Sequence, residues 1–113
     1  MKRISTHILD TNRGKPAADV PVQLEKQDSS TRWISLHSSR TDTDGRCPQL
    51  LPGDELPAGI YRLVFDTAAY FASQHAVGLY PVVEITFHVR EGDSHLHIPL
   101  LLSANGYTTY RGS

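Results

Sequence analysis

Hydrophobic and polar residues alternate along much of the chain, which is the pattern of β-strands with one buried and one solvated face. Val20, Val22 and Leu24, for example, share one face of residues 19–27, while polar side chains take the other. Short runs of this kind recur between clusters of Gly, Pro, Asn and Asp. The pattern predicts strands at residues 4–10, 19–27, 31–40, 60–67, 82–89, 95–103 and 106–113.

One segment departs from the β pattern. Residues 66–76, DTAAYFASQHA, open with Asp66 and Thr67, which are good N-cap types, and continue with alanines that favour a helix. We therefore expect one short helix in an all-β protein, a sandwich of two antiparallel sheets. The length of 113 residues fits a single domain over residues 1–113.

Charge and cysteine content exclude several classes of partner and structure. The formal net charge is −1 and no basic run is present, which argues against nucleic acid and membrane surfaces as partners. Cys47 is the single cysteine, so no internal disulfide can form. The apolar run at residues 100–102 is too short to span a bilayer, and the first ten residues lack the apolar stretch of a signal peptide. A cytoplasmic location is expected.

Two of the six histidines form an H-x-H pair. His95 and His97 are two positions apart on a predicted strand, so both side chains lie on one face. This spacing also occurs in metal sites, but a metal needs at least a third ligand, and the sequence shows no second cluster. A metal site at this pair stays open as an alternative. For three others, a structural role is the simpler interpretation: His37, His75 and His88.

Two further residues are candidates for chemistry. His7 alternates with Ser5 and Leu9 on the first predicted strand, where a lone histidine is more often a hydrogen-bonded structural residue than a catalyst. Arg46 follows the dipeptide Asp44-Gly45, a tight-turn signal that directs the next side chain out of the loop. An arginine in this position can bind an anion, although surface arginines after turns are common.

Taken together, these segments resemble a known family. STHILD, then TDTDGR, then YF in the helix, then HLHIPLLLSANGYTTYRGS are similar in type and order to the 5-hydroxyisourate hydrolases, the transthyretin-like enzymes of purine catabolism. The resemblance runs from about Ile4 to Ser113. Its most specific element is the terminal YRGS, which transthyretin, the hormone carrier of the same fold, does not keep. Ala104 and Asn105 depart from the family, which often has proline and an aromatic residue there.

The resemblance implies a fold, an assembly and a reaction. The family has a β-sandwich of two sheets with one short helix and forms a homotetramer with active sites in a channel between subunits. The implied substrate is 5-hydroxyisourate, hydrolysed to 2-oxo-4-hydroxy-4-carboxy-5-ureidoimidazoline in urate catabolism. The implied scheme requires no cofactor and no metal.

The resemblance also implies site residues, because each family position carries the expected type here. The implied catalytic residues are His7, Arg46, His97 and Ser113, and the implied substrate-binding residues are His7, Arg46, Tyr110 and Arg111. A neutral imidazole suits water activation near neutral pH. We assign His7 as the base and His97 as its partner, with the order of the two left open. The Arg46 guanidinium suits a substrate anion and a developing oxyanion, and the Ser113 hydroxyl or terminal carboxylate suits orientation of a histidine.

Three other functions stay open from the sequence. A transthyretin-type carrier would bind a small molecule in the same channel without chemistry. A sandwich interaction module would display binding loops, since fold alone does not fix function. A metal-dependent hydrolase would use His95 and His97, and a chelator would inhibit it.

Overall fold

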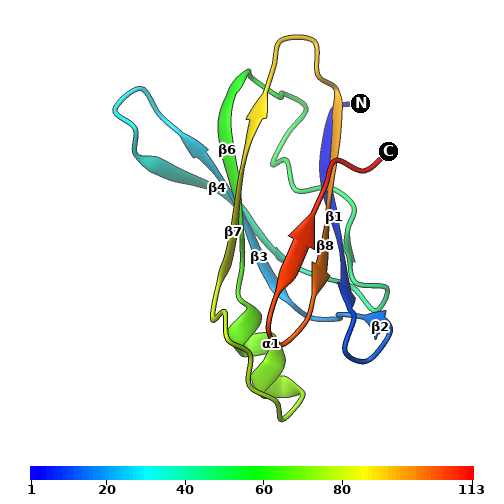
Figure 1. Cartoon of the computed structure of the whole chain (residues 1–113). Coiled ribbons are helices and arrows are strands. Elements are labelled where there is room, and N and C mark those ends of the chain that lie inside the picture. Colours follow the sequence, from blue (N-terminus) through cyan, green and yellow to red (C-terminus); the bar gives the residue numbers. More distant parts are fainter.

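Two β-sheets packed face to face form the body of the molecule, and a computed structural model describes all of residues 1–113 (Figure 1). One sheet has five strands and the other has four. In chain order the elements are β1 (Arg3–Asp10), β2 (Lys15–Pro16), β3 (Pro21–Gln27), β4 (Trp33–Arg40), β5 (Arg46–Cys47), β6 (Gly59–Phe65), α1 (Thr67–Ser73), β7 (Val83–Val89), β8 (His95–Leu102) and β9 (Tyr107–Thr109).

The strand order places the two ends of the sequence in one sheet. The five-stranded sheet has the order β2-β1-β8-β9, with β5 also paired to β1, and the four-stranded sheet has the order β4-β3-β6-β7. The expected sandwich of two sheets with one short helix is confirmed. The sheets are antiparallel as expected except at one pairing, because β1 and β8 run parallel.

The core lies between the sheets and follows the alternation seen in the sequence. Ile4 and Ile8 of β1 and Leu63 and Phe65 of β6 all belong to this core, and none of these four residues has exposed surface. The inward positions of β8 are likewise apolar. Burial of this one contiguous cluster of 22 residues supplies the main driving force for the fold. The outward positions of β1 and β8 remain available for other chemistry.

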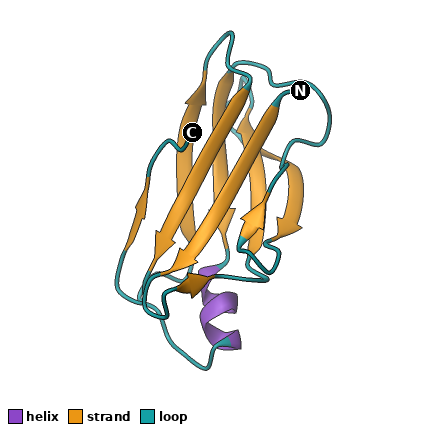
Figure 2. Cartoon of the chain, turned by 90° about the vertical axis from the view of Figure 1, so that its right-hand side faces the viewer, coloured by secondary structure: helices purple, strands orange, loops and turns teal.

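Helix α1 closes one end of the sandwich, and both chain termini lie toward the other end (Figure 2). The side chain of Asp66 caps the helix by accepting a hydrogen bond of 3.0 Å from the backbone N–H of Ala69. Tyr70 is a buried residue of α1, and its hydroxyl donates a 2.6 Å hydrogen bond to the carboxylate of Asp10 at the end of β1. No helix in the structure has the length and apolar character needed to cross a membrane.

The main differences from the predicted elements lie at short strands. β2 and β5 have two residues each and were not predicted, and β9 ends at Thr109 rather than at the chain terminus.

Ala104 and Asn105, the two residues that differ from the family pattern, lie in a loop held by hydrogen bonds to other segments. The N–H of Ala104 donates to Asn12 Oδ1 at 3.1 Å, and the N–H of Leu79 donates to the Ala104 carbonyl at 2.8 Å.

Candidate active site

The parallel pairing of β1 with β8 brings the first strand and the H-x-H pair onto one surface. Ser5 is in register with His97, and His7 is in register with Pro99. Because side chains alternate along each strand, Ser5, His7, His95 and His97 all project from the outer face of the five-stranded sheet. Residues 90 positions apart in the sequence thus become neighbours, at the end of the sandwich nearer the chain termini (Figures 1 and 2).

Arg46 reaches the same surface because β5 pairs with β1. The register sets Arg46 opposite His7. The preceding turn is closed by the N–H of Gly45, which donates to the Asp42 carbonyl at 2.9 Å, and by the N–H of Arg46, which donates to Asp42 Oδ1 at 3.0 Å. Gly45 has a φ of 75°, and an added Cβ would lie 2.5 Å from the Ile8 carbonyl oxygen, so only glycine fits here.

The guanidinium of Arg46 is free of partners within the chain. It takes part in none of the ion pairs, which involve Arg40, Arg62 and Arg111 instead. Its side chain makes no hydrogen bond to a protein group either, and Arg46 bonds to Asp42 through its backbone N–H and carbonyl. An unpaired, always-charged fork of donors beside two histidines is suited to binding an anion.

The C-terminal tail returns to this surface over His97. The N–H of Gly112 donates a 2.8 Å hydrogen bond to the His97 carbonyl, and the two residues form an isolated bridge. A Cβ added at Gly112 would lie 2.5 Å from Cδ2 of His97 and 3.2 Å from Cγ of Pro99. Glycine therefore allows the tail to lie directly against the imidazole. Ser113 follows at the rim of the same cleft.

A cleft of about 170 Å³ occupies the centre of this surface. Three of the predicted catalytic residues line it, namely Arg46, His97 and Ser113, and His7 lies beside Arg46. The full lining is Arg3, Ser5, Thr6, Arg46, Pro48, His95, His97 and Ser113. The charged side chains among them are those of two arginines, whose guanidinium groups are suited to an anionic ligand.

The environment of His97 favours its neutral form. Burial lowers the pKa of its imidazole below the ordinary value of 6.5, and the nearby Arg46, His7 and His95 lower this pKa further. One ring nitrogen, Nδ1, is 2.8 Å from the Ser5 hydroxyl oxygen. Nε2, on the other side of the ring, has no hydrogen-bond partner in the chain, so a neutral His97 can use it to accept or return a proton.

Tyr110 and Arg111 lie away from this cleft in the single chain. They line a separate cleft of about 270 Å³ between the sheet edges, together with Phe87 and His88 of β7. The guanidinium of Arg111 is 3.7 Å from Asp93. The tail thus divides, with Tyr110 and Arg111 facing β7 and Gly112 and Ser113 facing His97, and the predicted site is only partly assembled by one copy of the chain.

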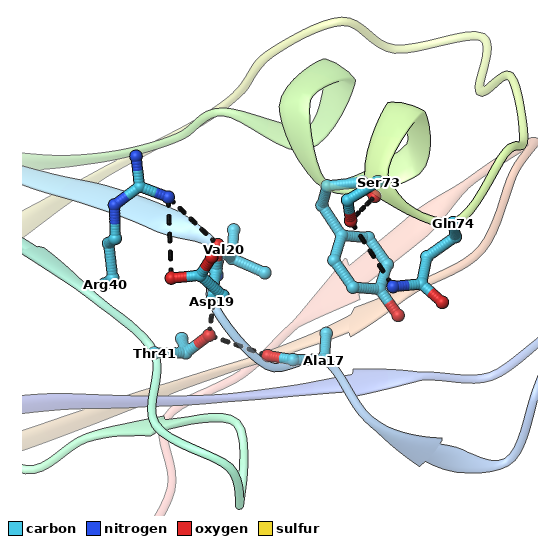
Figure 3. Close-up of polar contacts among 8 residues, drawn as sticks. Ala17, Asp19, Val20, Arg40, Thr41, Ser73 and Gln74 are labelled. Carbon is cyan, nitrogen blue, oxygen red and sulfur yellow. Dashed lines mark hydrogen bonds and ion pairs between the residues drawn. The ribbon is translucent and has the colours of Figure 1, made fainter.

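The largest cleft, about 480 Å³, lies on the four-stranded sheet and offers little chemistry. It contains no histidine or cysteine. Its one cation, Arg40, is held 3.5 Å from Asp19 in an ion pair (Figure 3). Thr41 beside it is bonded to the segment before β3, as its hydroxyl donates to the Ala17 carbonyl at 2.7 Å and accepts from the Val20 N–H at 2.9 Å (Figure 3). These contacts are structural.

The H-x-H pair does not form a metal-binding cluster in this chain. No group of three or more His, Cys, Asp or Glu side chains converges as metal ligands. His95 and His97 instead share a hydrogen-bond partner in Ser5, at 3.3 Å and 2.8 Å. The sequence pattern assigns no role to Ser5, because its position beside His97 depends on the parallel pairing of β1 with β8.

The two-sheet sandwich with one short helix defines a transthyretin-like protein. Residues 4–112 match the model of the HIUase/Transthyretin family, and the chain belongs to that family. It is 46% identical to the 5-hydroxyisourate hydrolase of Caulobacter vibrioides over 118 residues, which cover 100% of both chains.

Two solved structures with different names share this fold. The 5-hydroxyisourate hydrolase of Klebsiella pneumoniae is 35% identical, covers 100% of both chains and has a TM-score of 0.87. Sea bream transthyretin in complex with thyroxine is 33% identical, covers 96% of this chain and 93% of its own, and has a TM-score of 0.90. Overall shape is therefore common to enzyme and carrier, and the residues of the cleft must discriminate between them.

Proposed function

We propose that this protein is a 5-hydroxyisourate hydrolase of urate catabolism, forming 2-oxo-4-hydroxy-4-carboxy-5-ureidoimidazoline. The observation that carries the proposal is the pairing, in one cleft, of a histidine kept neutral with an arginine that has no partner of its own. A relative named as this hydrolase is 46% identical over the full length. A carrier has no need of either feature.

His97 is the residue we propose as the base that activates water, which reverses the order favoured from the sequence. Its ring lines the cleft and is fixed through Nδ1, whereas His7 lies outside the lining and makes no side-chain hydrogen bond within the chain. Water gives one proton to Nε2 of His97 as its oxygen bonds to the ring carbonyl carbon. The C–N bond then breaks, and the same proton passes to the departing nitrogen.

Arg46 stabilises the negative charge that develops on the carbonyl oxygen. Its planar fork can donate two parallel hydrogen bonds to an oxyanion or to an anionic ring. His7, next to it in register, adds a further donor to the substrate, and Ser113 contacts the substrate from the tail. Each step uses only side chains and water, so the scheme needs no cofactor.

A homotetramer with sites between subunits is the assembly that we propose. Eight large apolar side chains are exposed on the single chain, and half of them lie in the segment after α1. The eight are Met1, Ile34, Val77, Leu79, Tyr80, Val82, Tyr107 and Tyr110. The outer edge of β7 is also unpaired. Exposed apolar patches and free strand edges are typical of surfaces that pair with another copy.

In such an assembly Tyr110 and Arg111 would serve a site only from a neighbouring subunit. Light scattering on the purified protein is expected to give four times the chain mass of 12.5 kDa. A fully active monomer would contradict this assembly.

We also propose a cytoplasmic location, which a cell fractionation would test.

The test of the function is an absorbance time course of 5-hydroxyisourate made in place from urate by urate oxidase. We expect the decay to be accelerated by this protein in the presence of a chelator. Inhibition by the chelator would favour metal chemistry at His95 and His97. Tight thyroxine binding with no acceleration would assign the protein to the carriers.

Enzyme activity should persist at pH values below the range in which histidine ordinarily titrates. The base must be neutral, so falling pH removes activity as His97 becomes protonated, and its lowered pKa moves this loss to more acidic pH. The acid limb of kcat/KM is expected to have its midpoint below 6.5. In Arg46→Ala, loss of one nearby cation should raise that midpoint. A limb at or above 6.5 in the wild type would argue against His97 as the base.

Gly112→Ala is expected to displace the tail or the imidazole of His97, because the new methyl would meet Cδ2 of His97 at 2.5 Å. Misplacement of a catalytic group by about 1 Å can cost about a hundredfold in rate, so kcat should fall by that order while the melting temperature is unchanged. Gly53→Ala is the matched control, since an added Cβ there has nothing within 4 Å. Equal kcat for both variants would show that the tail does not position His97.

A further inference from the structure

Ser5 lies between the two histidines of the H-x-H pair. Its hydroxyl oxygen is 2.8 Å from Nδ1 of His97 and 3.3 Å from Nε2 of His95, and the residue is 6% exposed. We propose that Ser5 is a positioning residue that holds His97 in its Nδ1–H form and, with His95, passes protons between His97 and solvent. This inference rests on the proposed hydrolase function and assigns roles to two residues that the scheme above does not use.

A single hydroxyl can satisfy the two imidazoles in only two ways. Ser5 has one O–H to donate, so if it donates to His95 it must accept from His97. In that arrangement His97 carries its proton on Nδ1, and Nε2 presents a lone pair to the cleft. In the opposite arrangement Ser5 donates to His97, and Nε2 of His97 carries the proton. The first arrangement is the base form of the site and the second is the acid form.

A shift of protons along the hydrogen bonds from His97 through Ser5 to His95 converts one form into the other. When water gives a proton to Nε2 of His97, the Nδ1 proton moves to Ser5 Oγ. The hydroxyl proton of Ser5 moves to Nε2 of His95, and Nδ1 of His95 releases one proton to solvent. One proton enters and one leaves, and each residue ends neutral. The reverse shift lets Nε2 of His97 give its proton to the departing nitrogen.

The charges around His97 favour this route. A positive charge on His97 would be partly buried and would face Arg46, His7 and His95, and Arg3 lines the same cleft. His95 is exposed, so water can stabilise the charge there and accept the proton. Direct attack by Ser5 is a poorer interpretation, because the residue is almost fully buried and its hydroxyl is engaged with both imidazoles.

The first test reads the position of the proton in the resting protein. Nitrogen-15 NMR of the full chain, well above the pKa of histidine, is expected to show His97 as the Nδ1–H tautomer. In Ser5→Ala the resonance should move toward the Nε2–H tautomer that predominates in free histidine. A wild-type His97 with its proton on Nε2 would overturn the proposal without any need for a variant.

The second test measures turnover. Loss of one hydrogen bond to the base should lower kcat in Ser5→Ala about tenfold, with KM changed less than about twofold. His95→Gln cannot pass a proton, so its kcat should fall in weak buffer and recover on addition of imidazole. His37→Gln, a half-buried histidine on the other sheet, is the matched control and should show neither effect.

The outcomes separate this inference from the proposed function. An active wild type whose kcat is unaffected by Ser5→Ala, or a His95→Gln variant that imidazole does not rescue, overturns the relay and leaves the hydrolase intact. A wild type that does not hydrolyse 5-hydroxyisourate overturns the function and the relay with it. A purely structural role for Ser5 would lower the melting temperature without giving a buffer-dependent kcat in His95→Gln.

Discussion

Replacement of Arg46 by alanine is expected to lower kcat about a hundredfold or more, the usual loss when one oxyanion donor is removed. The guanidinium has no ion pair or hydrogen bond within the chain, so its removal should leave no protein group without its partner. Its backbone N–H still closes the turn through Asp42. The variant should therefore fold normally and lose catalysis selectively.

Two further variants complete the Arg46 experiment. Arg46→Lys keeps the charge but loses the planar fork, so its kcat should lie between those of the wild type and the alanine variant. Arg90→Ala removes an exposed arginine outside the cleft and should leave turnover unchanged. An alanine variant with wild-type kcat would show that Arg46 does not stabilise the reaction.

Replacement of His97 by asparagine is expected to reduce kcat about a hundredfold to ten-thousandfold, the range for loss of a general base. Asparagine is similar in size and can still bond to the Ser5 hydroxyl, but it cannot take a proton from water. The acid limb of the pH profile should also disappear from the residual activity. The measurement is steady-state kinetics over a range of pH on both proteins.

His7→Asn provides the comparison that distinguishes the two histidines. His7 contacts the substrate in our scheme without accepting the proton, so its replacement should raise KM more than it lowers kcat and should retain the acid limb. A greater loss of kcat in His7→Asn than in His97→Asn would restore the order that the sequence alone favoured.

The sandwich was predictable because it depends on local pattern. Alternation with a period of two is visible in each long strand, and the Asp66 cap followed by alanines marked the helix. β2 and β5 have only two residues each, too few to show any period. The expectation of one domain over residues 1–113 stays a prediction.

The site was predictable only in part, because its assembly depends on non-local pairing. Periodicity places His97 on one face of a strand but cannot say that β1 will lie beside it and present Ser5. Nor does the sequence YRGS show that the tail divides, with Arg111 facing Asp93 and Ser113 facing the cleft. Pairing registers, set by packing of the whole sandwich, decide both features.

The central claim is that this chain hydrolyses 5-hydroxyisourate in the His97–Arg46 cleft. The most direct measurement follows carbon-13-labelled urate by NMR during its oxidation, with a catalytic amount of the wild-type protein, of the Arg46→Ala variant, or of neither. We predict that the wild type converts the 5-hydroxyisourate signals into those of the ring-opened carboxylate much faster than the spontaneous reaction, and that Arg46→Ala stays close to the spontaneous rate. Equal rates in all three samples would contradict the account.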